Sequence, residues 1–537
     1  MFERRKSVKK ILSVMFLFAI VFGVITFGSI YTAEPVYAAR NPQFSQSSVK
    51  GKEHLTLFTN YMDGYSLYMD RDMSVDTSMS EVVTVFENAN KRIEIYKQYV
   101  GNTGRDSYIN YSNGFLNNTI DHKVDFKGVQ TFKGNKAHIV MWHREKLAKV
   151  KNDKNYYAIM DIPKGDYCYT ISIKANAPIG NVGGYTYLIE SFKTFQPTSA
   201  ADPIKTNKID IEEKNWNEET KAFYNNYFAD DAELTWGIFE TDFAYGYKYK
   251  TLDSYEEHFE YEFPVLLVYS HFADKKEAYP DIKTPLELAY QRGKTLELTL
   301  QTLWKDDGNM VYDVLQGEYD DFLMYYAKTI ADFGHPVLFR LGNEMNGDWC
   351  PYSSYNTSRD TVIFNEFYRY VASFFDKAGA QNVIWVWNPN HDSLPNYKWN
   401  HSMMYYPGDE YADVIGLTAY NTGTYYASVG ERWKTFRELY DVFYYDYCKR
   451  FEQPFMITEF ACASMGGDKN QWVIDMFNNI SRYDRIKVAI WWDGCDWDAN
   501  GNIARSYFID ETPTLMDTFR KYLRQPDYKA WYNDVMA

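Results

Sequence analysis

Between residues 215 and 528, the sequence alternates short apolar segments with amphipathic stretches, and few folds accommodate that alternation. The segments start roughly 30 to 45 residues apart, which is enough for one strand and one helix each. Helical crossovers make such strands parallel. Eight units of this kind predict an α/β domain, a closed (β/α)8 TIM barrel. The predicted strands are 235–239, 264–269, 295–302, 336–341, 383–387, 413–418, 454–458 and 486–492.

The residues before the barrel follow a different pattern. Residues 41–195 show strand-like alternation at 65–69, 138–142 and 167–173, which predicts a small β-rich or α+β accessory domain. Polar residues and prolines in the stretch 196–214 indicate a linker. The accessory domain carries no catalytic motif, so glycan binding, cell-wall attachment and simple spacing all remain open as its role.

The chain begins with a pattern typical of export. A basic start and an apolar run over 11–31 precede a small-residue cleavage site at 36–39, so we interpret residues 1–39 as a signal peptide. An uncleaved membrane anchor is the alternative, because the run is long enough to span a bilayer. Either interpretation predicts a secreted or extracellular protein. The net charge of −15 argues against a nucleic-acid partner.

Two glutamates follow strands on opposite sides of the predicted barrel. Glu344 comes after the fourth strand and Glu459 after the seventh. Active sites of this fold lie at the C-terminal ends of the strands, so both side chains should point into one mouth. Hydrolysis of a glycosidic bond needs two carboxyls, one protonated and one ionised. The sequence therefore predicts a glycosidase site.

The segments around both glutamates resemble glycoside hydrolase family 26, whose members are mainly endo-β-mannanases. The resemblance covers roughly residues 215 to 525 and is carried, in the family's order, by 336–349 (PVLFRLGNEMNGDW), 386–390, 405–416 and 457–460. It implies that Glu344 is the proton donor and general acid/base and that Glu459 is the nucleophile of a retaining reaction. Neither a metal nor a cofactor is implied. Tyr420 matches the tyrosine that hydrogen-bonds the nucleophile, although an ordinary aromatic residue at the barrel mouth is the alternative.

Other residues are candidates for substrate binding. Arg340 lies four residues before Glu344, and on a strand this spacing points both side chains inward. Asn343 stands where family mannanases usually have histidine, which puts specificity for mannan in doubt. Tryptophans at strand ends are candidate sugar platforms, with core packing as the alternative, and His271 is either a subsite residue or a structural one. The tryptophans are Trp304, Trp349, Trp387 and, on the last strand, Trp492 rather than its neighbour.

The sequence thus predicts an extracellular retaining endo-β-glycanase whose partner is a β-mannan-type polysaccharide. A β-glucanase or xylanase of the same fold remains an alternative. So does a surface protein that binds carbohydrate without catalysis, and so does an enzyme acting on the producer's own exopolysaccharide.

Overall fold

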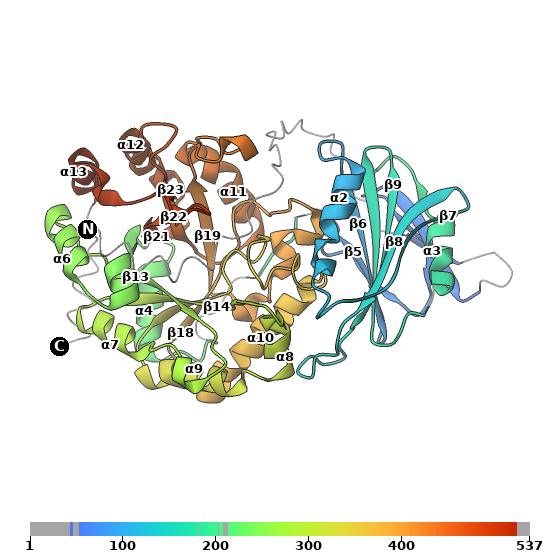
Figure 1. Cartoon of the computed structure of the whole chain (residues 1–537), viewed down its shortest axis with the longest axis horizontal. Helices are drawn as coiled ribbons and strands as arrows, with labels where there is room; N and C mark the ends of the chain where they lie inside the picture. Colours follow the sequence, from blue (N-terminus) through green and yellow to red (C-terminus); the bar gives the residue numbers. More distant parts are fainter. Residues whose placement is uncertain (1–42, 47–52, 181, 202, 208–212, 524–537) are drawn as a thin grey trace.

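A computed structural model describes residues 43–46, 53–180, 182–201, 203–207 and 213–523. The predicted signal peptide, residues 1–39, and part of the predicted linker 196–214 lie outside these residues. No helix within the described ranges combines the length and hydropathy that a bilayer span requires. Figure 1 shows a β-rich unit at one end of the molecule and a barrel of strands and helices at the other.

Eight strands form a closed parallel barrel, with neighbours that follow the order of the chain. The predicted (β/α)8 fold is therefore confirmed, and each predicted strand overlaps an observed one. The strands are β12 (Thr235–Glu240), β13 (Val265–His271), β14 (Thr295–Gln301), β17 (Val337–Leu341), β18 (Val383–Trp387), β19 (Val414–Asn421), β20 (Phe455–Cys462) and β21 (Ile486–Asp493).

Helices cover the outside of the barrel and pack against its strands (Figure 1). The connection from β18 to β19 differs, because it is built from short 3-10 helices at Lys398–Asn400, Ser402–Tyr405 and Asp409–Tyr411. The α-helices of the barrel are α4 (Glu218–Phe228), α5 (Thr241–Gly246), α6 (Lys250–Phe259), α7 (Lys283–Gln291), α8 (Met310–Gln316), α9 (Asp320–Phe333), α10 (Thr361–Ala378), α11 (Phe436–Arg450), α12 (Lys469–Asn479) and α13 (Pro513–Tyr522).

Two small hairpins lie at the C-terminal ends of barrel strands. The first pairs β15 (Trp304–Lys305) with β16 (Gly308–Asn309) and follows β14 directly. The second pairs β22 (Cys495–Trp497) with β23 (Ile503–Ser506) and follows β21. Both hairpins therefore lie at the end of the barrel where active sites of this fold are built.

The β-rich unit consists of two antiparallel sheets that enclose one core (Figure 1). Its helices are α2 (Arg105–Ser112) and α3 (Thr186–Ser191). The four-stranded sheet has the order β1 (Gln43–Gln46), β2 (Leu55–Asn60), β3 (Tyr65–Asp70) and β11 (Lys193–Thr194). The seven-stranded sheet has the order β4 (Ser74–Asp76), β5 (Thr84–Glu87), β6 (Lys91–Tyr99), β10 (Tyr167–Ala175), β9 (Tyr156–Lys164), β8 (Asn135–His143) and β7 (Lys123–Phe132).

The seven-stranded sheet is buried on both faces at its centre. Ile171 and Ile173 of β10 point into the core of the β-rich unit. The alternate residue Lys174 is also buried, and its Nζ pairs with Oε1 of Glu94 at 2.8 Å and with Oδ1 of Asp360 at 2.6 Å. Asp360 is the N-cap residue of barrel helix α10. The second face of this sheet is therefore the surface on which the barrel packs.

All five cysteines lie within the described residues, and none of them forms a disulfide bond.

Candidate active site

The interior of the barrel contains a buried arginine that connects several strands. Arg340 on β17 is 0% exposed. Its Nε donates to Oγ1 of Thr299 at 2.8 Å and lies 2.9 Å from Oε1 of Glu297, both on β14. Its Nη1 donates to Oδ1 of Asn388 and to Oε1 of Glu459, each at 2.9 Å. The structure therefore places Arg340 against one of the two predicted catalytic carboxyls.

Glu459 on β20 accepts hydrogen bonds from four side chains. Arg340 and Asn343 donate to Oε1, the latter at 3.1 Å, while Tyr420 donates to Oε2 at 3.0 Å and Tyr269 donates to the same atom. The pairing between β19 and β20 is irregular next to this residue, and such a bulge changes the direction of a side chain. Four donors, one of them cationic, stabilise the ionised form of a carboxylate.

Glu344 lies in a tight turn just beyond β17. Its φ of 54° and the φ of 58° at Gly342 are left-handed, a conformation that is costly for glutamate. Its N–H donates to the carbonyl oxygen of Asn388 at 2.7 Å, which ties the turn to the end of β18. The Nδ2 of Asn390 donates to Oε1 of Glu344. The turn directs the carboxyl of Glu344 toward the polar end of β18.

The environment of Glu344 favours its protonated form. Burial raises the pKa of Glu344 to about 7, and the charge of Glu459 adds to this rise, while the hydrogen bond from Asn390 opposes it. Glu344 can thus hold a proton close to neutral pH, whereas Glu459 accepts hydrogen bonds from Arg340, Asn343 and two tyrosines. Two carboxyls in opposite environments are the arrangement in which one acts as an acid and the other as a nucleophile or base.

A third carboxyl lies deeper in the barrel. Burial raises the pKa of Glu297 to about 8, although Arg340 opposes that rise. Glu297 and Glu459 therefore flank the same guanidinium from two strands. The positive charge of Arg340 thus offsets part of the cost of placing carboxyl groups in the interior.

Aromatic side chains surround the mouth. Trp492 stacks on Phe239 with ring centroids 5.1 Å apart and meets Tyr420 edge-on at 6.2 Å. Its neighbour Trp491 is buried on the other side of β21, where it packs against Phe519. The structure thus places Trp492, and not Trp491, beside the tyrosine that contacts Glu459.

Two further tryptophans are exposed. Trp349 is 38% exposed and lies over Gly347, where an added Cβ atom would come within 2.4 Å of its ring. Trp304 is 45% exposed on the hairpin after β14. Both side chains are accessible to a ligand.

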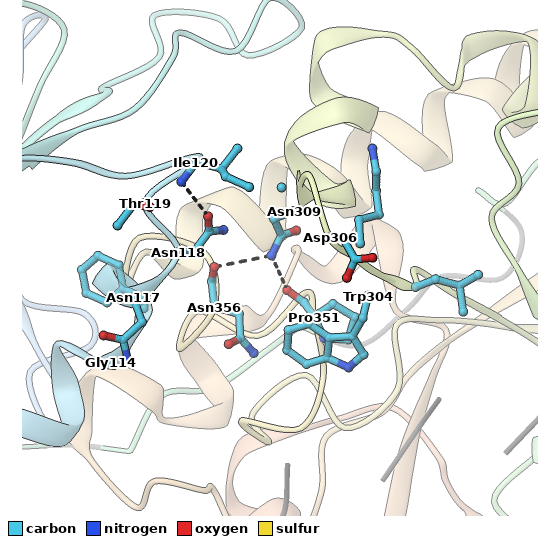
Figure 2. Close-up of a pocket in the computed structure, with 14 residues that line it drawn as sticks. Gly114, Asn117, Asn118, Thr119, Ile120, Trp304, Asp306, Asn309, Pro351 and Asn356 are labelled. Carbon is cyan, nitrogen blue, oxygen red and sulfur yellow. Dashed lines mark hydrogen bonds between the residues drawn. The ribbon is translucent and has the colours of Figure 1, made fainter. Parts of the chain in front are cut away.

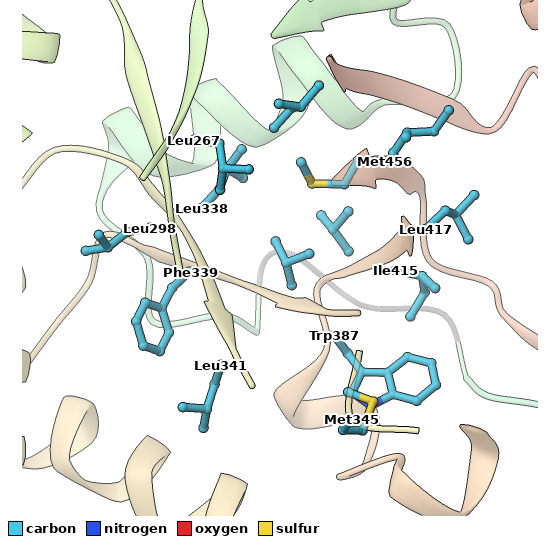
Figure 3. Packing of buried hydrophobic residues seen from close by; sticks show 14 of the residues in the cluster. Leu267, Leu298, Leu338, Phe339, Leu341, Met345, Trp387, Ile415, Leu417 and Met456 are labelled. Carbon is cyan, nitrogen blue, oxygen red and sulfur yellow. The ribbon is translucent and has the colours of Figure 1, made fainter. Parts of the chain in front are cut away.

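The expectation for Trp387 as a sugar platform needs correction. Its side chain is 0% exposed, donates from Nε1 to the carbonyl oxygen of Tyr405 at 3.1 Å and packs against Phe451. Figure 3 shows Trp387 within the cluster of buried hydrophobic residues. It faces the surrounding layer because it lies on the outer side of β18. His271 is half-buried at the end of β13, and burial lowers the pKa of its imidazole.

Tyr269 and Gln301 carry no motif in the sequence, whereas Asn390, which donates to Glu344, belongs to the segment 386–390. Tyr269 lies beside Glu459. Gln301, the last residue of β14, donates to Oδ1 of Asn343 at 2.6 Å. The sequence feature that could have identified them is their position near the C-terminal ends of barrel strands, since polar residues there commonly belong to the active site.

A TIM barrel whose mouth holds one carboxyl with a raised pKa and one carboxylate with four donors defines a glycoside hydrolase domain. Residues 289–448, which run from α7 to α11, match the model of glycosyl hydrolase family 26. The barrel is therefore similar to a family 26 catalytic domain over these residues.

Proteins that are similar to this chain in sequence or structure are described as an endoglucanase or as mannanases. Endoglucanase H of Acetivibrio thermocellus is 30% identical over 224 residues, which are 40% of this chain and 24% of that protein. A mannan endo-1,4-β-mannosidase of Bacillus subtilis strain 168 is 28% identical over 195 residues, 35% of this chain and 47% of that protein. The chain thus spans a quarter to a half of these relatives. A family 26 β-mannanase from Bacteroides ovatus has a similar structure, with a TM-score of 0.44 and 17% identity over 57% of this chain and 93% of that one.

Proposed function

We propose that the barrel is a retaining endo-β-glycanase that hydrolyses β-mannan-type polysaccharide. The opposite environments of Glu344 and Glu459 carry this proposal. The similarity of the barrel to a mannan endo-1,4-β-mannosidase supports the choice of substrate.

In the proposed reaction, Glu459 attacks the anomeric carbon while Glu344 passes its proton to the departing glycosidic oxygen. A covalent glycosyl-enzyme forms at Glu459. Glu344, now ionised, takes a proton from water, and the resulting hydroxide displaces the sugar from Glu459. The predicted separation of the carboxyls in such an enzyme is about 5–5.5 Å. Tyr269 and Tyr420 keep the attacking carboxylate in one orientation through their hydrogen bonds.

Specificity at the cleavage site depends on Asn343. Its amide joins Gln301 to Oε1 of Glu459. The family resemblance implies that the residue at this position meets the 2-hydroxyl of the attacked sugar. Hydrogen bonds to this hydroxyl strengthen in the transition state. The 2-hydroxyl is axial in mannose and equatorial in glucose. Asparagine in place of the histidine of most family mannanases therefore favours a second candidate, a β-glucanase, and the resemblance to endoglucanase H supports it.

We further propose that the enzyme acts outside the cytoplasm, on the strength of the export pattern in residues 1–39. Mass spectrometry of the protein recovered from the culture medium would locate its N-terminus. A chain that stays inside the cell with all of these residues would contradict the proposal.

The test of the reaction is the release of reducing sugar from glucomannan, galactomannan, mixed-linkage β-glucan and xylan. NMR of the first-formed product should show the β-anomer. Glu459→Ala should abolish release, and Glu344→Gln should lower kcat/KM by about 10²- to 10⁴-fold. Cleavage of mixed-linkage β-glucan alone would select the second candidate. An α-anomeric first product, or full activity in Glu459→Ala, would contradict the mechanism.

A further inference from the structure

A cavity of about 430 Å³ lies between the β-rich unit and the barrel. The β-rich unit supplies one wall from 114–120, the segment that follows α2. The barrel supplies the other wall from 303–309, after β14, and from Pro351 and Asn356 in the loop after β17. Figure 2 shows Asn117 and Ile120 on one side and Trp304 and Asp306 on the other.

The cavity is connected to the mouth of the barrel through two neighbouring strands. β14 and β17 pair with each other, and their following loops both line the cavity. Gln301 ends β14 and bonds Asn343, which in turn contacts Glu459. Trp304 comes three residues after Gln301 along the same loop. A chain leaving the mouth over β14 and β17 would therefore pass this cavity.

The lining matches the surface of a sugar ring. The ring of Trp304 is 45% exposed, and Asn117, Thr119 and Asp306 are exposed beside the cavity. A pyranose presents an apolar C–H face, which stacks on an aromatic ring, and hydroxyls at its edge, which bond amides, hydroxyls and carboxylates. The volume falls within the roughly 300–1,000 Å³ of small-molecule sites.

A buried asparagine holds together the two barrel loops that line the cavity. Asn309 is buried, and its Nδ2 donates to the carbonyl oxygens of Pro351 at 2.8 Å and Asn356 at 3.4 Å (Figure 2). The loops after β14 and β17 are thereby fixed relative to each other. A site formed in advance loses little entropy when it binds a ligand.

We propose that this cavity is a distal saccharide-binding site, in which the β-rich unit and the barrel together hold a part of the polysaccharide remote from the cleaved bond. The proposal rests on the proposed function and extends it, since it makes the β-rich unit a part of the substrate cleft. The ligand is a neutral β-linked pyranose chain.

The test uses the full chain and β-1,4-manno-oligosaccharides from the trimer to the hexamer. If the reducing-sugar assay shows cleavage of mixed-linkage β-glucan alone, the corresponding gluco-oligosaccharides replace them. Trp304→Ala changes the barrel wall, and the double variant Asn117→Ala/Ile120→Ala changes the wall of the β-rich unit. Tyr445→Ala is the matched control, because Tyr445 is 46% exposed on outer helix α11. Each wall variant should lower kcat/KM for the hexamer about tenfold and leave that for the trimer within about twofold.

Titration calorimetry with the hexamer in a Glu459→Gln background separates this proposal from the proposed function. A loss of hexamer affinity in both wall variants, with none in the control, supports the site even if the wild type hydrolyses nothing. Active wall variants whose kcat/KM and affinity for the hexamer equal those of the wild type would overturn the site and leave the proposed function standing. An effect confined to Trp304→Ala would overturn the contribution of the β-rich unit.

Discussion

Replacing Asn390 by alanine should move the basic limb of the pH–activity profile to higher pH. The proposed general acid Glu344 must be protonated, so kcat/KM falls as the pH rises through its pKa of about 7. The hydrogen bond from Asn390 stabilises the ionised form of Glu344 and thus lowers that pKa. Without this donor the pKa rises, and the protonated form persists to higher pH.

The size of the shift follows from the strength of the hydrogen bond. A hydrogen bond to a charged group contributes about 1.5–3 kcal/mol, and one pKa unit corresponds to about 1.4 kcal/mol. Glu344 is only half-buried, so solvent replaces part of the lost interaction. We therefore expect the basic limb to move upward by about one pH unit.

The assay is kcat/KM on the preferred oligosaccharide from acidic to alkaline pH. Ser393→Ala is the control, because Ser393 contacts Asn346 in the same turn and leaves the donor to Glu344 in place. Its basic limb should coincide with that of the wild type. A basic limb in Asn390→Ala that stays near neutral pH, or moves to lower pH, would refute the assignment of Glu344 as the acid.

Three further substitutions probe the supports of the site. Arg340→Met removes the cation between two buried carboxyl groups and should lower the free energy of unfolding by about 3–5 kcal/mol; urea unfolding that matches the wild type would contradict this. Gly347→Ala places a Cβ within 2.4 Å of the Trp349 ring, so KM for polysaccharide should rise severalfold with little change in kcat, whereas an unchanged KM would show that this ring does not bind substrate. Tyr111→Phe removes the hydrogen bond from the β-rich unit to Asp348, in the loop that carries Glu344, and should lower the free energy of unfolding by about 1–3 kcal/mol in urea; a stability equal to that of the wild type would mean that this contact does not stabilise the loop.

The barrel could be predicted because its strands are short, apolar and regularly spaced, and because helices separate them. The positions of Glu344 and Glu459 followed from the rule that strand ends of this fold meet at one mouth. Periodicity could not decide which face of a fully apolar strand looks inward. β18 reads VIWVW, and only the structure shows that Trp387 lies on its outer side.

The sequence alone could not predict contacts between segments that lie far apart along the chain. Nothing in the alternation of 167–173 indicates that the polar residues of that strand face a second folded unit instead of water. Lys174 looks like a solvated end of a strand in the sequence, yet it is buried between Glu94 and Asp360. Likewise, Tyr269 resembles any aromatic residue in a strand until the barrel closes and brings it to Glu459.

The buried ion cluster between the sheet and helix α10 has a thermodynamic consequence. If the two units separated, Asp360 would lose its contacts with Lys174 and Tyr157, whereas Glu94 would keep Lys174 and Arg92 within its own sheet. Separation is therefore costly, and melting of either unit should bring down the other. A calorimetric scan should show one cooperative peak for the whole chain rather than two. The molecule then behaves as a single melting unit, although its architecture looks like two.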